Sequence, residues 1–294
     1  MEMQKVLHLK DALKLKNPKL DGEFIITEKV EGWYVRIPYR ASTNTWSTPL
    51  SSAGRTIPAF AWMVVQLNTY LPKLKEDCFI IAEAYLEDTS FEITNGIFNR
   101  SVGDCSCYNV VFKLHDIIYP NGLNTTALVR YINLEILANE VNKHWFELLP
   151  IISIEKYDSD NWQRHFEVIA NRGGEGIVAK RDTSIYMAGK RNSDLLKLKL
   201  ELTVDCLAVA LEETVGDKGN SGLVLVSRRK NGVLVRTVIG KHVDQDLFRK
   251  DSSNVIGKVV QVKAMEEYAD GQLRQPVFQH VRHDKEGANY NDQE

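Results

Sequence analysis

The most informative stretch of the sequence is Gly174-Glu175-Gly176-Ile177-Val178-Ala179-Lys180. It places a carboxylate between two glycines, and a short apolar run after it predicts a strand that ends in a lysine. An acid suited to a metal or a ribose would then share a sheet with a cation suited to phosphate. A tight turn before a strand with a solvated lysine is the simpler interpretation, but glycine on both sides of the acid makes it less natural.

A second stretch, Glu28-Lys29-Val30-Glu31-Gly32, follows the apolar residues Phe24-Ile25-Ile26, which predict a strand. A lysine at a strand end is a candidate covalent nucleophile, and Gly32 would let the backbone pass close to a ligand. Because an unperturbed lysine has a pKa of about 10.4, burial, a nearby cation or a metal must lower its pKa before it can attack. Taken alone, the stretch also fits a turn on the protein surface.

Three further segments carry charged residues within or directly after apolar segments that predict strands. In Leu195-Leu196-Lys197-Leu198-Lys199-Leu200 the alternation puts both lysines on one face of a strand, as in a phosphate site or a solvent-facing edge strand. Glu83 follows the apolar run Phe79-Ile80-Ile81, where a carboxylate is costly unless it is paired or binds a ligand. Arg282-His283-Asp284-Lys285 follows a strand-like segment and by itself fits a charged tail.

Length, composition and charge restrict the class of protein. The chain has 294 residues, which predicts two domains, and its 44% hydrophobic content excludes a disordered chain. A formal net charge of -2 excludes a uniformly basic coat for nucleic acid, but not one basic face. The four cysteines include one C-x-C pair, Cys105 and Cys107, without the spacing of zinc ligands. Few cysteines, a charged N-terminus and no apolar run of membrane-spanning length predict a cytoplasmic protein.

Periodicity predicts both strands and helices, and therefore an α+β fold. Before residue 202, strands are expected at residues 24–26, 33–37, 78–84, 109–118 and 176–179, and helices at residues 59–71, 125–141 and 161–171. Later strands are expected at residues 206–211, 223–228, 233–239 and 259–264, with a helical turn at residues 245–249. The hairpin turn Asn231-Gly232 joins two of them. We therefore predict a sheet-and-helix domain over residues 1–202 and a small β-barrel, of the OB-fold type, over residues 203–294.

The order of these segments resembles that of the covalent nucleotidyltransferase superfamily, which comprises ATP-dependent polynucleotide ligases and mRNA capping enzymes. The motifs KVEG, EGIVAK, KLK and RHDK and the strand acid Glu83 occur in the family's order, so the resemblance covers nearly the whole chain. It implies an adenylation domain with antiparallel and mixed sheets, followed by an OB-fold. The chain is most similar to minimal ATP-dependent DNA ligases of phage and viral type, whose barrel pattern DGxLRxPxF matches residues 270–278.

The resemblance implies three successive transfers. Lys29 would attack the α-phosphate of ATP to form a lysyl-AMP and release pyrophosphate. The AMP would pass to the 5′-phosphate at a nick in duplex DNA, and the 3′-hydroxyl would then displace AMP from this DNA-adenylate and seal the strand. Lysines and a divalent metal, Mg²⁺, would neutralise the phosphates. Such an enzyme would serve DNA repair, replication or recombination in a bacterial cell or an infected host.

Site residues follow from the resemblance position by position. Lys29 would be the nucleophile and Glu31 the acid that assists it, while Lys197 and Lys199 would act on the nucleotide phosphates. The implied metal contacts are Glu83 and Glu175. The implied nucleotide-binding residues are Glu28, Lys29, Arg36, Arg55, Glu83, His115, Val178, Lys180, Lys197, Lys199, Arg282, Asp284 and Lys285.

The sequence departs from the family patterns K-x-D-G-x-R and S-R-x-G. Glu31 stands in the place of Asp, Tyr34 in the place of the first Arg, and Ser52 in the place of the second. Arg36 and Arg55 are candidate replacements for these arginines.

We expect nicked duplex DNA to be held through its phosphates by a monomer that has no membrane partner. The candidate DNA contacts are Arg36, Arg55, Lys190, Arg191, Arg228, Arg229 and Lys230. The barrel is expected to rotate about residues 200–205, so that RHDK reaches ATP first and DNA occupies the same face later.

Two alternatives stay open. An mRNA capping guanylyltransferase has the same motifs and a barrel but uses GTP. A catalytically silent protein that binds nucleic-acid ends would keep the fold alone, although the intact Lys29 argues against it.

Overall fold

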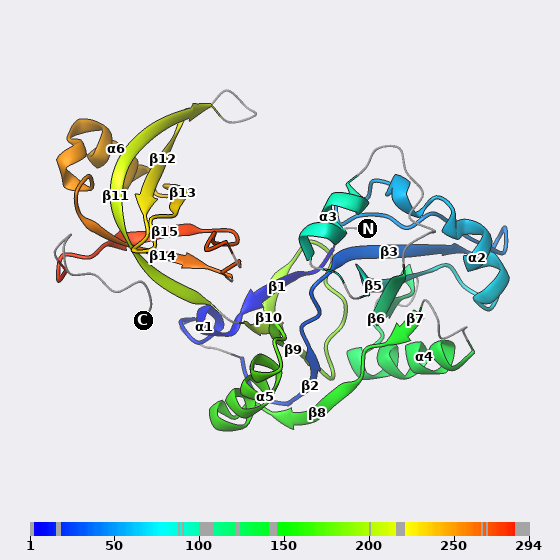
Figure 1. Cartoon of the computed structure of the whole chain (residues 1–294). Helices are drawn as coiled ribbons and strands as arrows, with labels where there is room; N and C mark the ends of the chain where they lie inside the picture. Colours follow the sequence, from blue (N-terminus) through cyan, green and yellow to red (C-terminus); the bar gives the residue numbers. More distant parts are fainter. Residues whose placement is uncertain are drawn as a thin grey trace. The chain divides into compact units, whose positions relative to one another are not determined.

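A computed structural model gives the fold (Figure 1) and describes residues 3–15, 19–87, 89, 91–99, 109–120, 124–140, 146–199, 201–215, 221–265, 267–268 and 270–285. Cys105, Cys107 and Leu200 lie outside these residues. The chain divides into two compact units, Met1–Lys199 and Leu200–Glu294. Each unit has its own hydrophobic core.

Two five-stranded sheets form the first unit, in the orders β1-β10-β9-β2-β8 and β4-β3-β5-β6-β7. The strands of the first sheet are β1 (Lys5–His8), β10 (Arg191–Lys199), β9 (Gly176–Arg181), β2 (Glu23–Glu28) and β8 (Ile151–Lys156). Those of the second sheet are β4 (Thr45–Trp46), β3 (Trp33–Arg40), β5 (Cys78–Leu86), β6 (Val110–Ile118) and β7 (Phe146–Leu148). One pair in each sheet, β1–β10 and β6–β7, is parallel and the others are antiparallel, so the sheets are mixed and the predicted α+β class is confirmed.

Helices pack on one side of each sheet. The helices of this unit are α1 (Leu9–Ala12), α2 (Met63–Tyr70), α3 (Phe91–Phe98), α4 (Ala127–Asn139) and α5 (Ser159–Asn171). Helix α5 begins after Asp158, whose carboxylate accepts hydrogen bonds from two backbone amides of the first turn. Its Trp162 packs edge-to-face on Phe24 of β2, with ring centroids 5.2 Å apart. Met63 of α2 and Leu134 of α4 are buried in the core of the other sheet.

The second unit is one antiparallel sheet in the order β13-β12-β11-β14-β15. Its elements are β11 (Leu202–Val215), β12 (Ser221–Arg228), β13 (Leu234–Val238), α6 (His242–Lys250), β14 (Val259–Ala264) and β15 (Val277–Val281). Strands β12 and β13 pair across Asn231-Gly232, where Gly232 has a φ of +90°, so the predicted hairpin is confirmed. Strand β11 is longer than expected because its first half pairs with β14 and its second half with β12.

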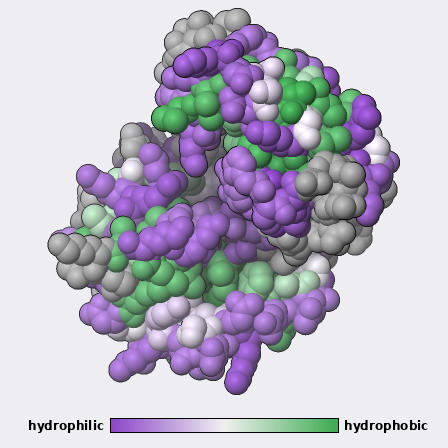
Figure 2. All heavy atoms as spheres, turned by 90° about the vertical axis from the view of Figure 1, so that its left-hand side faces the viewer, coloured by the Kyte–Doolittle hydropathy of each residue, from purple (hydrophilic) through white to green (hydrophobic). Residues whose placement is uncertain are grey.

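Several helices differ from the prediction: α1 was not expected, and α6 is longer than the helical turn expected at residues 245–249. The helix expected at residues 59–71 begins only at Met63, and a 3-10 turn at Pro58–Phe60 precedes it. Helix α3 was not predicted. Among the residues that the structure describes, no helix has the length and apolar character needed to cross a lipid bilayer. The face drawn in Figure 2 is mainly hydrophilic, with apolar side chains in smaller groups between, as is usual for a globular surface.

Candidate active site

A cavity of about 280 Å³ lies between the two sheets of the first unit, and strand alternation determines its lining. On β2, Phe24 and Ile26 point into the core under α5, whereas Ile25 and Thr27 line the cavity. The same alternation sends Glu83 of β5 and Lys197 of β10 into the cavity, while their neighbours along the strand pack in the cores. The cavity therefore collects the polar side chains of otherwise apolar strands.

Lys29 lies directly after β2 and lines this cavity. Its backbone amide donates a hydrogen bond of 2.8 Å to the carbonyl of Gly176, which ties it to the start of β9. Its ammonium forms an ion pair with the carboxylate of Glu175, and both side chains are largely buried. The structure thus joins the two motifs that the sequence holds nearly 150 residues apart.

Two glycines of these motifs pack closely against neighbouring strands. A Cβ atom on Gly176 would lie 2.1 Å from the carbonyl oxygen of Leu198 on β10, and the residue has a φ of +139°. A Cβ atom on Gly32 would lie 2.8 Å from the carbonyl oxygen of Ala84 on β5. Both positions exclude a side chain, so each motif needs its glycine for close backbone packing.

Glu83 projects from β5 toward Lys29 and Glu175. Burial raises the pKa of its carboxyl to about 8, the Lys29 ammonium opposes this rise, and the Glu175 carboxylate adds to it. Glu31 lies half-buried in the turn between β2 and β3 and does not line the cavity.

The two carboxylates beside Lys29 fit one kind of metal site. Within the described part of the chain, no three or more His, Cys, Asp or Glu side chains gather to hold a metal ion. Mg²⁺ often takes one or two protein carboxylates and completes its shell with water and substrate phosphates. Glu83 and Glu175 therefore fit an Mg²⁺ that arrives with phosphates, and they do not form an all-protein site.

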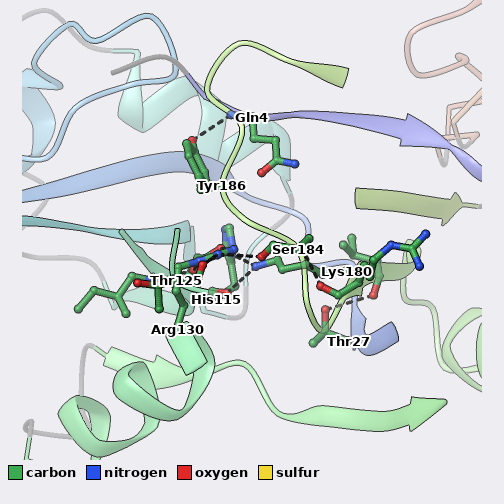
Figure 3. Close-up of polar contacts among 12 residues, drawn as sticks. Gln4, Thr27, His115, Thr125, Arg130, Lys180, Ser184 and Tyr186 are labelled. Carbon is green, nitrogen blue, oxygen red and sulfur yellow. Dashed lines mark hydrogen bonds and ion pairs between the residues drawn. The ribbon is translucent and has the colours of Figure 1, made fainter. Parts of the chain in front are cut away.

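A second cluster of charges lies in the same cavity, at Lys180 of β9 (Figure 3). The Lys180 ammonium donates to the Asp116 carboxylate at 2.7 Å and to the His115 carbonyl at 3.2 Å. Arg130 of α4 holds the other side of Asp116 through Nε at 2.8 Å and also donates to the carbonyls of Thr125 and Ser184. The cluster thus connects β6, β9 and α4.

Charge balance sets the protonation states in this cluster. Burial alone would raise the pKa of Asp116, but Lys180 and Arg130 together lower it to about 2. Burial lowers the pKa of Lys180, and Asp116 opposes that shift. Burial and the Lys180 charge lower the pKa of His115 to about 4. At neutral pH the cavity therefore holds an ionised Asp116 and a neutral His115 imidazole.

Three further residues of the first unit that are expected to bind the nucleotide line the cavity. Lys197 lines the cavity, and burial, followed by the charges of Lys199 and Lys29, lowers its pKa. Val178 and Glu28 also line the cavity, and the Glu28 carboxylate pairs with Arg172.

Arg36 and Arg55, the two candidate replacements, lie outside the cavity lining. Arg36 is only 3% exposed, its guanidinium donates to the Ser51 carbonyl at 3.5 Å, and it lies 6.0 Å from the centre of the Phe79 ring. This burial argues against the direct nucleotide and DNA contacts expected of Arg36. Arg55 is exposed on the adjoining loop, and Lys190 and Arg191 are exposed at the start of β10.

The basic hairpin of the second unit presents two of its three cations to solvent. Arg228 and Lys230 are exposed, whereas Arg229 is 3% exposed and turns inward. Its guanidinium pairs with Glu267 at 2.8 Å and donates to the Gly271 carbonyl at 2.8 Å. The DNA contact expected of Arg229 is thus incompatible with its position, because the side chain stabilises the fold.

The RHDK motif forms its own network within the second unit. Arg282 holds Asp284 through two hydrogen bonds of 2.9 and 2.8 Å, and the pKa of Asp284 is lowered chiefly by this contact. Arg282 and Lys285 both donate to Asp205 on β11.

Several site residues were not predicted from the sequence. Asp116 follows His115 directly, and two successive polar residues in a buried strand could have indicated that both belong to a functional site. Arg130 lies on an ordinary amphipathic helix. Gln4 and Tyr186 meet only through tertiary contact, where the backbone N–H of Gln4 donates to the Tyr186 hydroxyl at 2.9 Å. No local pattern distinguishes these three residues.

Comparison with known proteins identifies the family. The family model described as ATP dependent DNA ligase domain matches residues 4–199, so the chain belongs to that family. A DNA ligase 4 from Candida glabrata is 23% identical over 253 residues, which is 78% of this chain and 25% of that protein. The chain spans about a quarter or less of the length of the curated relatives it matches.

Solved structures show the same fold. A Lig E DNA ligase, studied for DNA binding with a minimal scaffold, is 19% identical with a TM-score of 0.71, covering 96% of this chain and 99% of that one. The ATP-dependent DNA ligase of bacteriophage T7, in complex with ATP, is 19% identical with a TM-score of 0.54, covering 96% and 98%. The predicted resemblance to ATP-dependent DNA ligases is thereby confirmed.

Proposed function

We propose that this chain is an ATP-dependent DNA ligase that seals nicks between a 5′-phosphate and a 3′-hydroxyl through a lysyl-AMP and a DNA-adenylate. The observation that carries the proposal is the Lys29 ammonium, paired with Glu175 in a cavity that also holds Glu83 and Lys197. A nucleophile, two acids and a phosphate-binding cation are the groups that the first transfer requires.

Lys29 is the proposed nucleophile. Its amine attacks the α-phosphorus of ATP, the bond from that phosphorus to the bridging oxygen breaks, and pyrophosphate leaves with the electron pair. The Lys29 ammonium must lose one proton before it attacks, and Glu175, which already accepts a hydrogen bond from it, is within reach to take this proton. The second proton leaves the nitrogen for water as the bond to phosphorus forms. Glu31, in the following turn, is proposed to support this part of the chain.

Charge neutralisation is assigned to lysines and to a metal. Lys197 and Lys199, on one face of β10, are proposed to hold the nucleotide phosphates. Mg²⁺, held by Glu83 and Glu175 together with phosphate oxygens, would stabilise negative charge on the transferred group.

The adenine end is assigned to the Lys180 cluster. Val178 offers an aliphatic surface to one face of the base, and the neutral His115 imidazole offers a ring for stacking. Lys180 is a donor-only group, so it favours an acceptor on the base. Backbone groups of Glu28 would lie near the same edge.

The second unit is proposed to be an OB-fold that completes the enzyme, with the domain boundary near residue 202. Arg282, Asp284 and Lys285 would orient the pyrophosphate during the first transfer. Exposed Arg55, Lys190, Arg191, Arg228 and Lys230 are the candidates for phosphate contacts with nicked duplex DNA, which a monomer would bind. The buried thiols of Cys78 and Cys206 suit the reducing cytoplasm.

A nick-sealing assay tests the proposal. A labelled duplex with one 5′-phosphorylated nick is incubated with the protein, Mg²⁺ and either ATP or GTP, and strand length is read on a denaturing gel. Sealing with ATP alone, lost in Lys29→Ala, is expected. Sealing that survives Lys29→Ala would contradict the mechanism, and nucleotide transfer from GTP alone would favour a capping enzyme.

A further inference from the structure

The RHDK network contains a carboxylate that no motif includes. Asp205 lies near the start of β11 and is 2% exposed. Its Oδ1 accepts from Arg282 Nη1 at 3.4 Å, and its Oδ2 accepts from Lys285 Nζ at 2.6 Å. One buried carboxylate therefore holds both cations of the motif.

The backbone around this contact is fixed by sheet pairing. Asp205 pairs with Gln261 of β14, and Gln261 pairs with His280 of β15. The backbone amide of Arg282 donates to the Val259 carbonyl at 2.8 Å, which anchors the chain as it leaves β15. Sheet pairing thus fixes the Asp205 carboxylate relative to the start of the motif. The carboxylate can therefore hold the two flexible cationic side chains in defined positions relative to each other.

A buried carboxylate is costly unless cations pair with it, and cations that are largely buried need an acid as a partner for the same reason. The Arg282 and Lys285 side chains are only 12% and 18% exposed, which is far less than is usual for these residue types. The Asp205 carboxylate is a buried partner that both long side chains share.

We propose that Asp205 is a positioning residue for the first transfer, acting through Arg282 and Lys285. This inference rests on the proposed function, because the two cations matter for catalysis only if they orient the leaving pyrophosphate. The later transfers no longer involve pyrophosphate, so they do not need this arrangement.

Asp205→Asn tests the inference because it removes the charge and nearly keeps the shape. Single-turnover formation of the lysyl-AMP is expected to slow by about 10- to 100-fold, the range in which misplaced catalytic groups act. Sealing of a nick that already carries a 5′-adenylate is expected to stay within about twofold of the wild type, a split that general unfolding would not produce.

Glu213→Gln is the matched control, because it removes an exposed ion pair, with Arg249, on the same strand. It should leave both rates unchanged. Asp205→Glu keeps the buried charge but moves it one methylene further out. This variant should fold, should slow lysyl-AMP formation less than Asp205→Asn does, and should leave sealing of the adenylated nick nearly unchanged. This variant keeps the test valid if Asp205→Asn does not fold.

A double-mutant cycle with Lys285→Ala shows whether Asp205 acts through the motif. Non-additive losses in the first transfer are expected, because both substitutions disturb one unit. Additive losses, equal losses in both assays, or Asp205 variants that match Glu213→Gln would overturn the inference alone. A wild type that forms no lysyl-AMP would overturn the proposed function as well.

Discussion

At the scale of single residues, Glu83 has an unusual environment in the cavity. Its carboxyl is buried beside another carboxylate, and its pKa is raised from 4.5 to about 8. Between these two values the folded protein holds a proton that the unfolded chain has lost, so the free energy of unfolding falls as the pH rises through this window. The cost of an ionised Glu83 in the free protein is consistent with a site built for a cation.

Glu83→Gln should remove this pH dependence. Without metal or nucleotide, the variant should gain stability over the wild type, on the order of 3 kcal/mol, between about pH 5 and about pH 8.5. Thermal unfolding across this range measures it, with the exposed Glu212→Gln as control. Parallel curves for Glu83→Gln and wild type would contradict the assigned pKa shift.

At the scale of secondary structure, the Arg130–Asp116–Lys180 cluster holds α4, β6 and β9 together. Asp116 and Arg130 are 5% and 2% exposed, and Lys180 completes the charge balance from inside the cavity. One buried network therefore serves both the fold and the orientation of a proposed nucleotide contact.

Arg130→Met is expected to destabilise the protein by about 3–5 kcal/mol, because it leaves the Asp116 charge with only one of its two partners. Urea unfolding measures this loss. Arg249→Gln breaks an exposed ion pair with Glu213 and should not change the midpoint measurably. Equal midpoints for both variants would show that the buried network contributes nothing to stability.

Gly176→Ala tests the junction of the two motifs. A Cβ atom there would meet the Leu198 carbonyl at 2.1 Å, and the same residue accepts the Lys29 amide hydrogen bond. We expect a loss of roughly 2 kcal/mol or more and a marked loss of lysyl-AMP formation. Gly240→Ala, where no atom lies within 4 Å, should stay within about 0.5 kcal/mol of the wild type. A neutral Gly176→Ala would contradict the close approach of β9 and β10.

Much of this arrangement could be predicted from local patterns. Alternation of apolar and charged residues identified the lysines of β10, and short apolar runs identified the strands next to Lys29, Glu83 and Glu175. Partners contributed by other elements could not be predicted. Arg130 looks like an ordinary helix residue, and the inward turn of Arg229 depends on Glu267, 38 residues away. Local sequence does not encode which of three adjacent basic residues turns inward to pair with a distant acid.

At the scale of the whole molecule, the two units have separate cores and different proposed roles. The first contains the nucleotide cavity, and the second contains the RHDK network and an exposed basic hairpin. With a net charge of -2, the proposed DNA binding would have to rely on local basic surfaces rather than on overall charge.

Affinity for nicked duplex DNA should therefore depend strongly on salt. Raising the monovalent salt from about 50 to about 200 mM should weaken binding at least about tenfold, since phosphate contacts release counterions. Fluorescence anisotropy with a labelled nick measures this. The double variant Lys190→Ala/Arg191→Ala should flatten the salt dependence, whereas Arg249→Gln should not. An affinity that does not change with salt would contradict DNA binding through phosphate contacts.

We propose that Lys29 carries the nucleotide. The most direct test is intact mass, followed by peptide mapping, after the protein is freed of bound AMP and incubated with Mg²⁺ and ATP or GTP. We expect an acid-labile AMP on Lys29 from ATP only, absent from Lys29→Ala. AMP on another residue, or no adduct from either nucleotide, would contradict it.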